Sequence, residues 1–271
     1  MDWGIPTLIE APGPEESAEL CNELGFNFVE LNMNLPQYQK PDASLIREIS
    51  EKHNIYFTIH MDENLDMCSF NPRVAEAYLQ TMLETIHFAR KAGIRILNMH
   101  LPQGVYFTLP DKKVYLYDMN RSHFLSRIRS TVALCEEASQ GEVTICIENT
   151  GTFGMQFLQE AADIFLQSQM FSLTFDIGHD HSADGADKPF ILQRQDRLKH
   201  FHIHDALGRK NHMPLGKGEL DLQWYIALAE DKHCRAVLEV KTAQALRESA
   251  EWLKQHKFLK NNIMKKGQDR P

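Results

Sequence analysis

The chain has 271 residues, of which 43% are hydrophobic and 24% are charged, a composition typical of a folded globular protein. Its formal net charge of −8 at pH 7 gives a surface that repels nucleic acids and anionic membranes at long range. The N-terminus lacks a basic segment followed by an apolar one, and no apolar run is long enough to cross a bilayer, so we expect a cytoplasmic protein that does not engage a membrane.

The five cysteines have neither the even number nor the paired spacing of a disulfide framework. No Cys-x-x-Cys pair occurs, so the sequence does not indicate a zinc site built on cysteine. Cys146 lies within an apolar segment and is expected in the core.

The chain repeats one unit, a short apolar strand followed by an amphipathic helix. The segments with a strand pattern are 4–9, 26–31, 55–59, 95–99, 143–147, 171–175, 198–203 and 235–238. The segments with a helical pattern are 15–24, 43–53, 71–91, 121–139, 155–167, a short one around 190–194, 220–231 and 242–255. Asn71-Pro72 begins the longest of these helices, and Gly93 ends it.

Eight strands alternating with helices predict a single-domain (β/α)8 barrel, or TIM barrel, over residues 1–259, followed by a polar tail at 260–271. An open, doubly wound sheet is the competing architecture, but no glycine-rich phosphate-binding turn follows the first strand. Polar loops are expected between the barrel elements, including one that contains Tyr106 and Tyr115 and another that follows His204.

The third to eighth predicted strands each end in an imidazole or a carboxylate: His60, His100, Glu148, Asp176, His202 and Glu239. One such residue is most often a loop side chain or a helix cap, but the same coincidence on six consecutive strands is hard to explain that way. The carboxyl ends of barrel strands converge on one mouth. Neutral nitrogen and anionic oxygen donors gathered there predict a divalent metal site.

Four stretches resemble the xylose-isomerase-like barrel superfamily, which includes sugar (phosphate) isomerases and epimerases and also AP endonucleases of the endonuclease IV type. They are Ile147-Glu-Asn-Thr150, Phe175-Asp-Ile-Gly-His179, His202-Ile-His-Asp205 with the following 214–221, and Leu238-Glu-Val240.

The resemblance implies that Glu148, Asp176, His202 and Glu239 hold one shared metal ion. Three carboxylates and one imidazole suit Mn, Mg, Co or Zn. For an isomerase or epimerase, the substrate is a small sugar or sugar phosphate, and Glu148 and Glu239 are the groups that transfer protons. His179 resembles the family histidine that contacts a substrate oxygen. Glu30 is either a polar anchor at the mouth or an exposed strand residue.

The endonuclease branch is the alternative, with additional zinc ions. His60, His100, His179 and His212 match places where that branch keeps extra ligands. However, this chain has Lys210 at the position where the endonuclease branch supplies an aspartate ligand. The acidic chain also lacks the basic surface that DNA binding needs. These histidines, and His204 beside them, are then substrate-binding or supporting residues. Association into a homo-oligomer is left open.

Overall fold

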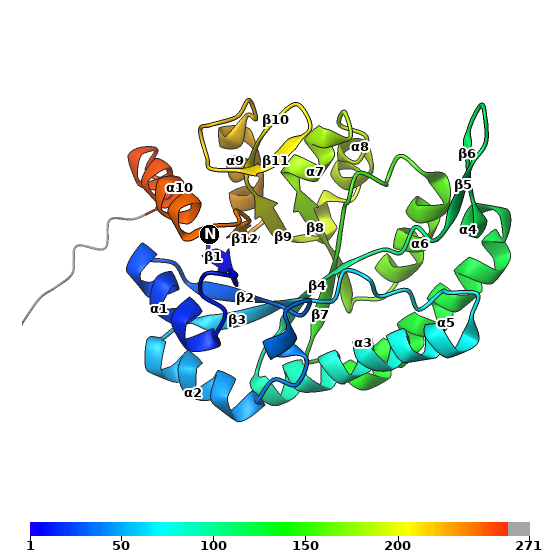
Figure 1. Ribbon diagram of the computed structural model, residues 1–271, viewed down its shortest axis with the longest axis horizontal. Coiled ribbons are helices and arrows are strands. Elements are labelled where there is room, and N and C mark those ends of the chain that lie inside the picture. The colour runs from blue at the N-terminus through cyan, green and yellow to red at the C-terminus, as the bar shows by residue number, and fades with distance from the viewer. Residues whose placement is uncertain (260–271) are drawn as a thin grey trace, which may run out of the picture.

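Eight parallel strands close into a barrel in the computed structural model, which describes residues 1–259 (Figure 1). The barrel strands are β1 (Trp3–Pro6), β2 (Phe28–Asn32), β3 (Tyr56–His60), β4 (Ile96–His100), β7 (Thr144–Glu148), β8 (Phe171–Asp176), β9 (Leu198–Ile203) and β12 (Arg235–Leu238). They follow one another around the barrel in chain order, and β1 pairs with β12 to close it. The predicted (β/α)8 barrel is confirmed; the predicted tail lies outside the described residues.

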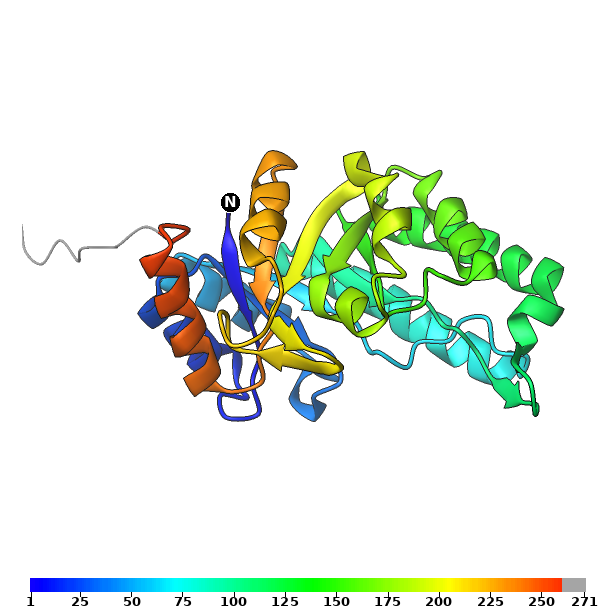
Figure 2. The same cartoon turned by 90° about the horizontal axis from the view of Figure 1, so that it is seen from above.

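The helices surround these strands, as Figures 1 and 2 show. The main ones are α1 (Pro14–Leu24), α2 (Ala43–His53), α3 (Pro72–Ala92), α5 (Arg121–Ser139), α6 (Gln156–Leu166), α8 (Lys188–Leu192), α9 (Leu222–Asp231) and α10 (Ala243–Gln255). The signals read from the sequence act as expected in α3. The Asn71 side chain accepts a hydrogen bond from the backbone N–H of Arg73, and Gly93 ends the helix with a φ of 76°.

The apolar core fills the layer between strands and helices. Phe165 of α6 packs against Phe171 of β8 with ring centroids 4.6 Å apart, and Phe124 of α5 is fully buried. Burying an aromatic side chain of this kind stabilises the fold by about 1.5–3 kcal/mol. All five cysteines are buried free thiols, which confirms the core placement of Cys146.

Strand register brings the donor residues to one end of the barrel. His100 of β4 lies opposite Glu148 of β7, and Asp176 of β8 lies opposite His202 of β9. Because all eight strands are parallel, their carboxyl ends meet at the same mouth. Residues far apart in the sequence therefore become neighbours there.

Two segments predicted as polar loops form antiparallel hairpins instead. The first joins β5 (Tyr106–Thr108) to β6 (Lys113–Tyr115), continues into α4 (Leu116–Met119), and projects away from the barrel in both views (Figures 1 and 2). The second joins β10 (Asp205–Leu207) to β11 (Lys210–Met213) and begins directly after β9.

Short helical turns complete the described chain, namely η1 (Pro36–Tyr38), α7 (Ile177–Ser182) and η2 (Gln195–Arg197). Of these, α7 begins immediately after β8, where the sequence suggested a loop, and it carries His179. Among the described helices, none combines the length and apolar character needed to span a membrane.

Candidate functional site

Four side chains converge at the centre of the mouth, and we call Glu148, Asp176, His202 and Glu239 the central cluster. One ligand atom from each lies within 4.8 Å of the others. Nδ1 of His202 is 3.1 Å from Oε2 of Glu239, 3.3 Å from Oε2 of Glu148 and 3.9 Å from Oδ2 of Asp176. Three carboxylates thus face one imidazole nitrogen, a donor set that suits a hard or borderline divalent ion.

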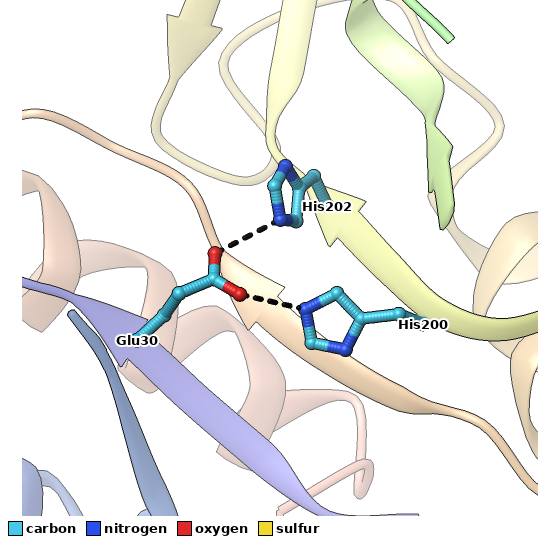
Figure 3. Close-up of side chains that lie close together, drawn as sticks. All are labelled: Glu30, His200 and His202. Carbon is cyan, nitrogen blue, oxygen red and sulfur yellow. Dashed lines mark hydrogen bonds and ion pairs between the residues drawn. The ribbon is translucent and has the colours of Figure 1, made fainter. Parts of the chain in front are cut away.

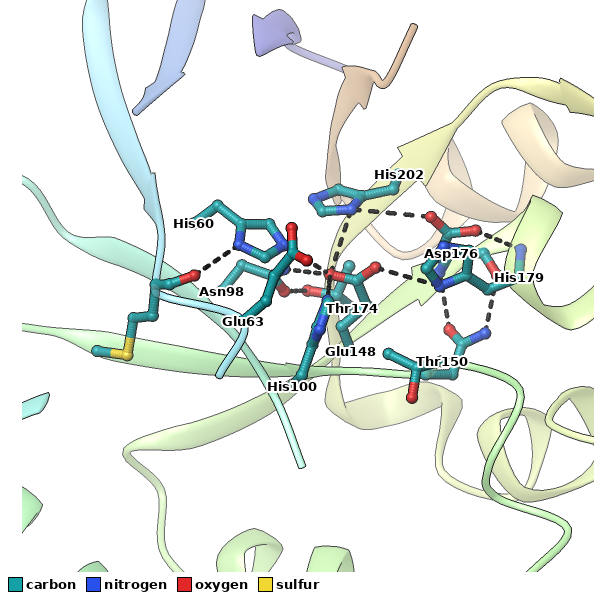
Figure 4. A network of polar contacts seen from close by, with 12 residues as sticks. His60, Glu63, Asn98, His100, Glu148, Thr150, Thr174, Asp176, His179 and His202 are labelled. Atoms are coloured by element: carbon teal, nitrogen blue, oxygen red, sulfur yellow. Dashed lines mark hydrogen bonds and ion pairs between the residues drawn. The ribbon is translucent and has the colours of Figure 1, made fainter. Parts of the chain in front are cut away.

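A second group shares Glu148, and we call His60, His100 and Glu148 the histidine cluster (Figure 4). Nε2 of His60 lies 3.3 Å from Oε2 of Glu148, and Nε2 of His100 lies 3.2 Å from the same oxygen. Nδ1 of His60 lies 2.8 Å from the carbonyl oxygen of Met61 and donates to it. This contact orients the ring so that Nε2 faces the cluster.

The position of Glu148 is fixed by amide and hydroxyl groups on neighbouring strands. Nδ2 of Asn98 donates to Oε2 of Glu148, and the Thr174 hydroxyl donates to Oδ1 of Asn98 at 2.6 Å. Burial alone would raise the pKa of Glu148, but the His202 and His100 imidazoles outweigh burial and hold that pKa well below its ordinary value. Glu148 is therefore an ionised carboxylate at neutral pH.

The other ionisable groups respond to the same concentration of charge. Burial would lower the pKa of His60, yet Glu148 and Glu30 together raise it to about 9. The pKa of Glu239 would be raised by burial, but His202 and then Lys241 bring it well below its ordinary value. Both carboxylates that the sequence analysis suggested as proton-transferring groups are thus ionised at neutral pH.

The unpaired atoms of the site fit a bound cation. Within the described part of the chain, both ring nitrogens of His202, Nε2 of His100 and Oε2 of Glu239 are among the buried atoms without a hydrogen-bond partner. Buried polar atoms almost always have a partner, so these unpaired atoms need an explanation. A divalent ion held by the central cluster would supply one for Nδ1 of His202 and Oε2 of Glu239, because such an ion binds imidazole nitrogen and carboxylate oxygen directly.

The remaining predicted histidines surround the central cluster without joining it. Nε2 of His204, which is fully buried, lies 3.3 Å from both carboxylate oxygens of Asp176. The backbone N–H of His212 donates to Nδ1 of His204 at 2.9 Å, and Nδ1 of His212 lies 3.0 Å from the carbonyl oxygen of Glu239. The ring centroids of His179 and His212 are 5.9 Å apart.

A third group of possible ligands lies beside the central cluster. His204, His212 and Glu239 are near enough to share an ion, whereas His179 belongs to no such group of the described residues. Lys210 is exposed at the start of β11. The hairpin β10–β11 sets this arrangement, because His212 has a left-handed φ of 56° that turns its ring toward Glu239.

Several supporting residues were missed from the sequence. Asp187 accepts hydrogen bonds from the backbone N–H groups of Gly151 and Phe153, both at 2.7 Å, and from Nδ2 of Asn149 at 3.0 Å. Asn149 also donates to the carbonyl oxygen of Asp176. The short polar motif after Glu148 could have suggested Asn149, but Asp187 lies in a separate loop and gave no signal.

The chain matches a known family over most of its length. Residues 18–256 fit the model of the xylose isomerase-like TIM barrel. A relative, the uncharacterized protein MJ1188 of Methanocaldococcus jannaschii, is 26% identical over 236 residues, which cover 83% of each chain.

Two solved structures share the fold. A D-tagatose 3-epimerase-like protein has a TM-score of 0.76 at 21% identity, covering 95% of this chain and 97% of that one. The IolI protein with a bound zinc atom has a TM-score of 0.73 at 13% identity, covering 96% and 100%. On the strength of the family match, this chain belongs to the xylose isomerase-like TIM barrel family.

Proposed function

We propose that this protein is a divalent-metal-dependent isomerase or epimerase of a sugar or sugar phosphate. The observation that carries the proposal is the convergence of two ionised carboxylates, Glu148 and Glu239, on Nδ1 of His202, within 3.3 and 3.1 Å. The epimerase-like protein with the same fold and the zinc atom bound to IolI support the choice of chemistry and of cofactor class.

The residues would hold the metal through the central cluster, in which His202 supplies nitrogen and Glu148, Asp176 and Glu239 supply oxygen. A bound divalent ion polarises a carbonyl group and stabilises the negative charge that develops on substrate oxygens. The sequence and the donor set do not select among Mn, Mg, Co and Zn.

Proton transfer is assigned to the two carboxylates. One takes the proton from the carbon next to the substrate carbonyl. For isomerisation, a proton returns to the neighbouring carbon; for epimerisation, a proton reaches the same carbon from its other face. Burial would lower the pKa of His179, but Asp176 and Glu148 raise it, which supports assigning His179 the role of donor to a substrate oxygen.

The test is turnover of a panel of ketoses and ketose phosphates in D2O, with Mn, Mg, Co or Zn supplied in turn. We expect one substrate class to incorporate deuterium next to the carbonyl with the wild-type protein and not with Glu239→Gln. Glu219→Gln is the matched control, because Glu219 also lies beside a histidine, His181 at 2.9 Å, but is exposed and outside both clusters. Deuterium incorporation that survives in Glu239→Gln would refute the assignment.

The histidine cluster favours a second candidate function, phosphodiester cleavage by more than one zinc ion. Glu148 belongs to both clusters, so the residues of each cluster would hold one ion, and paired ions would stabilise the attacking and leaving oxygens. The net charge of −8 opposes binding to a DNA backbone. Cleavage of a duplex containing an abasic site, lost in His60→Asn, would establish this function in place of the first.

A further inference from the structure

Glu30 is a buried carboxylate that the proposed reaction does not use. It lies on β2 and is 2% exposed, which excludes the exposed strand residue that was one reading of the sequence. Its Oε1 is 3.0 Å from Nε2 of His202, and its Oε2 is 3.1 Å from Nε2 of His200 (Figure 3). The Thr58 hydroxyl also donates to Oε2, at 3.2 Å.

The two ring nitrogens of His202 face different surroundings. Nε2 faces the single carboxylate of Glu30, whereas Nδ1 faces the three carboxylates of the central cluster. An ionised carboxylate only accepts hydrogen bonds, so the nitrogen held against Glu30 keeps its proton. The other nitrogen then supplies the lone pair, as in the carboxylate–histidine–metal arrangements that orient metal ligands.

The Glu30 side of the ring is poorly suited to hold the ion itself. Glu30, His200 and His202 are near enough to share a cation. However, His200 and Thr58 already direct hydrogen bonds at Oε2 of Glu30, and only one carboxylate is present to balance a divalent charge. The 3.1 Å contact of Nε2 of His200 with Glu30 has hydrogen-bond geometry, and Nε2 of His202 lies 3.0 Å from Oε1 of Glu30 at ion-pair distance without that geometry.

We infer that Glu30 is a positioning residue that fixes the ring of His202 with Nε2–H toward the barrel interior and Nδ1 toward the metal. This inference rests on the metal site of the proposed function, and it holds for either reaction. Loss of a carboxylate partner behind a metal-binding histidine typically weakens metal affinity about 10–100-fold.

The first test is the zinc dissociation constant, measured by competition with a chromophoric chelator, for the wild type and for Glu30→Gln. We expect Glu30→Gln to bind about 10–100-fold more weakly. Thr58→Val is the matched control, because it removes a hydrogen bond to Glu30 in the same buried layer but leaves the carboxylate facing His202. Its affinity should change little.

The second test needs no variant and holds even if Glu30→Gln does not fold. Long-range 1H–15N correlation spectra of the zinc-loaded wild type identify which His202 nitrogen carries a proton. We expect a protonated Nε2 and a metal-bound Nδ1.

Three outcomes would overturn the role of Glu30 and leave the proposed function standing. They are a metal-bound Nε2 of His202, equal zinc affinity in Glu30→Gln and the wild type, and equal losses of affinity in Glu30→Gln and Thr58→Val. A wild-type protein that binds none of Zn, Mn, Mg or Co would overturn both this role and the proposed metal-dependent function.

Discussion

Replacing Glu148 by glutamine is the most informative single change, because both clusters depend on this carboxylate. Its Oε2 lies within 3.3 Å of one nitrogen from each of His60, His100 and His202. The substitution keeps the shape of the side chain and removes its charge, so it removes an anionic ligand without opening a cavity.

The expected loss of metal affinity follows from the position of Glu148 among the ligands. Removing a residue that hydrogen-bonds to a metal ligand already weakens metal affinity about 10–100-fold, so removing a ligand itself should weaken it more than about 100-fold. That corresponds to more than about 2.7 kcal/mol of binding free energy. If the histidine cluster holds a second ion, that ion should be lost as well, because Glu148 belongs to both groups.

The metal-free fold should survive the change. Breaking an isolated buried ion pair costs about 3–5 kcal/mol. Glu148 also repels Glu239, whose pKa it raises, and losing this repulsion offsets part of that cost. The apolar layer between strands and helices is untouched.

The assay is metal affinity by chelator competition together with urea unfolding of the metal-free protein, with Glu219→Gln as the exposed control. Glu148→Gln should fold and bind metal weakly, while Glu219→Gln should match the wild type in affinity. Wild-type metal affinity in Glu148→Gln, or a metal-free variant that does not fold, would refute the reasoning.

Three further changes test other parts of the structure. Asp187→Asn should lower the free energy of unfolding by about 1–3 kcal/mol, because an amide N–H2 then faces a backbone N–H. Asp184→Asn is its control, since Asp184 is exposed and has a left-handed φ. Equal effects of the two substitutions would contradict the argument. Burial lowers the pKa of His212 to about 4, so below pH 6.5 the unfolded state takes up a proton that the folded state does not. Between pH 6.5 and 4, the free energy of unfolding of the metal-free protein should therefore fall by up to about 3 kcal/mol more in the wild type than in His212→Asn. An equal fall in the two proteins, measured by urea unfolding, would contradict this. A thiol reagent should label none of the cysteines before unfolding, since all are buried. Burial also raises the pKa of four of them to about 12, namely Cys21, Cys135, Cys146 and Cys234. Rapid labelling of the native protein would contradict this prediction.

The barrel could be predicted from the sequence because alternating apolar strands and amphipathic helices are local patterns. The pattern of donors at strand ends gathered six residues at the mouth, His60 and His100 among them. The choice of Glu148, Asp176, His202 and Glu239 from these came from the resemblance to xylose-isomerase-like barrels.

The contacts behind the cluster could not be predicted, because they depend on register and on turns. Glu30 and His200 are 170 residues apart and meet only across the closed barrel. The contact between His204 and Asp176 and the contact of His212 with Glu239 depend on the β10–β11 hairpin, whose turn is Gly208-Arg209 and whose pairing the sequence analysis did not predict. Side-chain periodicity predicts which face a residue occupies, but not the partner that it meets there.

The most direct test of the central claim is the number of divalent metal ions per chain, by elemental analysis of protein purified without added metal. At least one ion per chain in the wild type and in Glu219→Gln, and none in Glu239→Gln, is the expected result. A wild-type protein without stoichiometric metal, or a Glu239→Gln variant that retains its full complement, would contradict a metal centre built on Glu148, Asp176, His202 and Glu239.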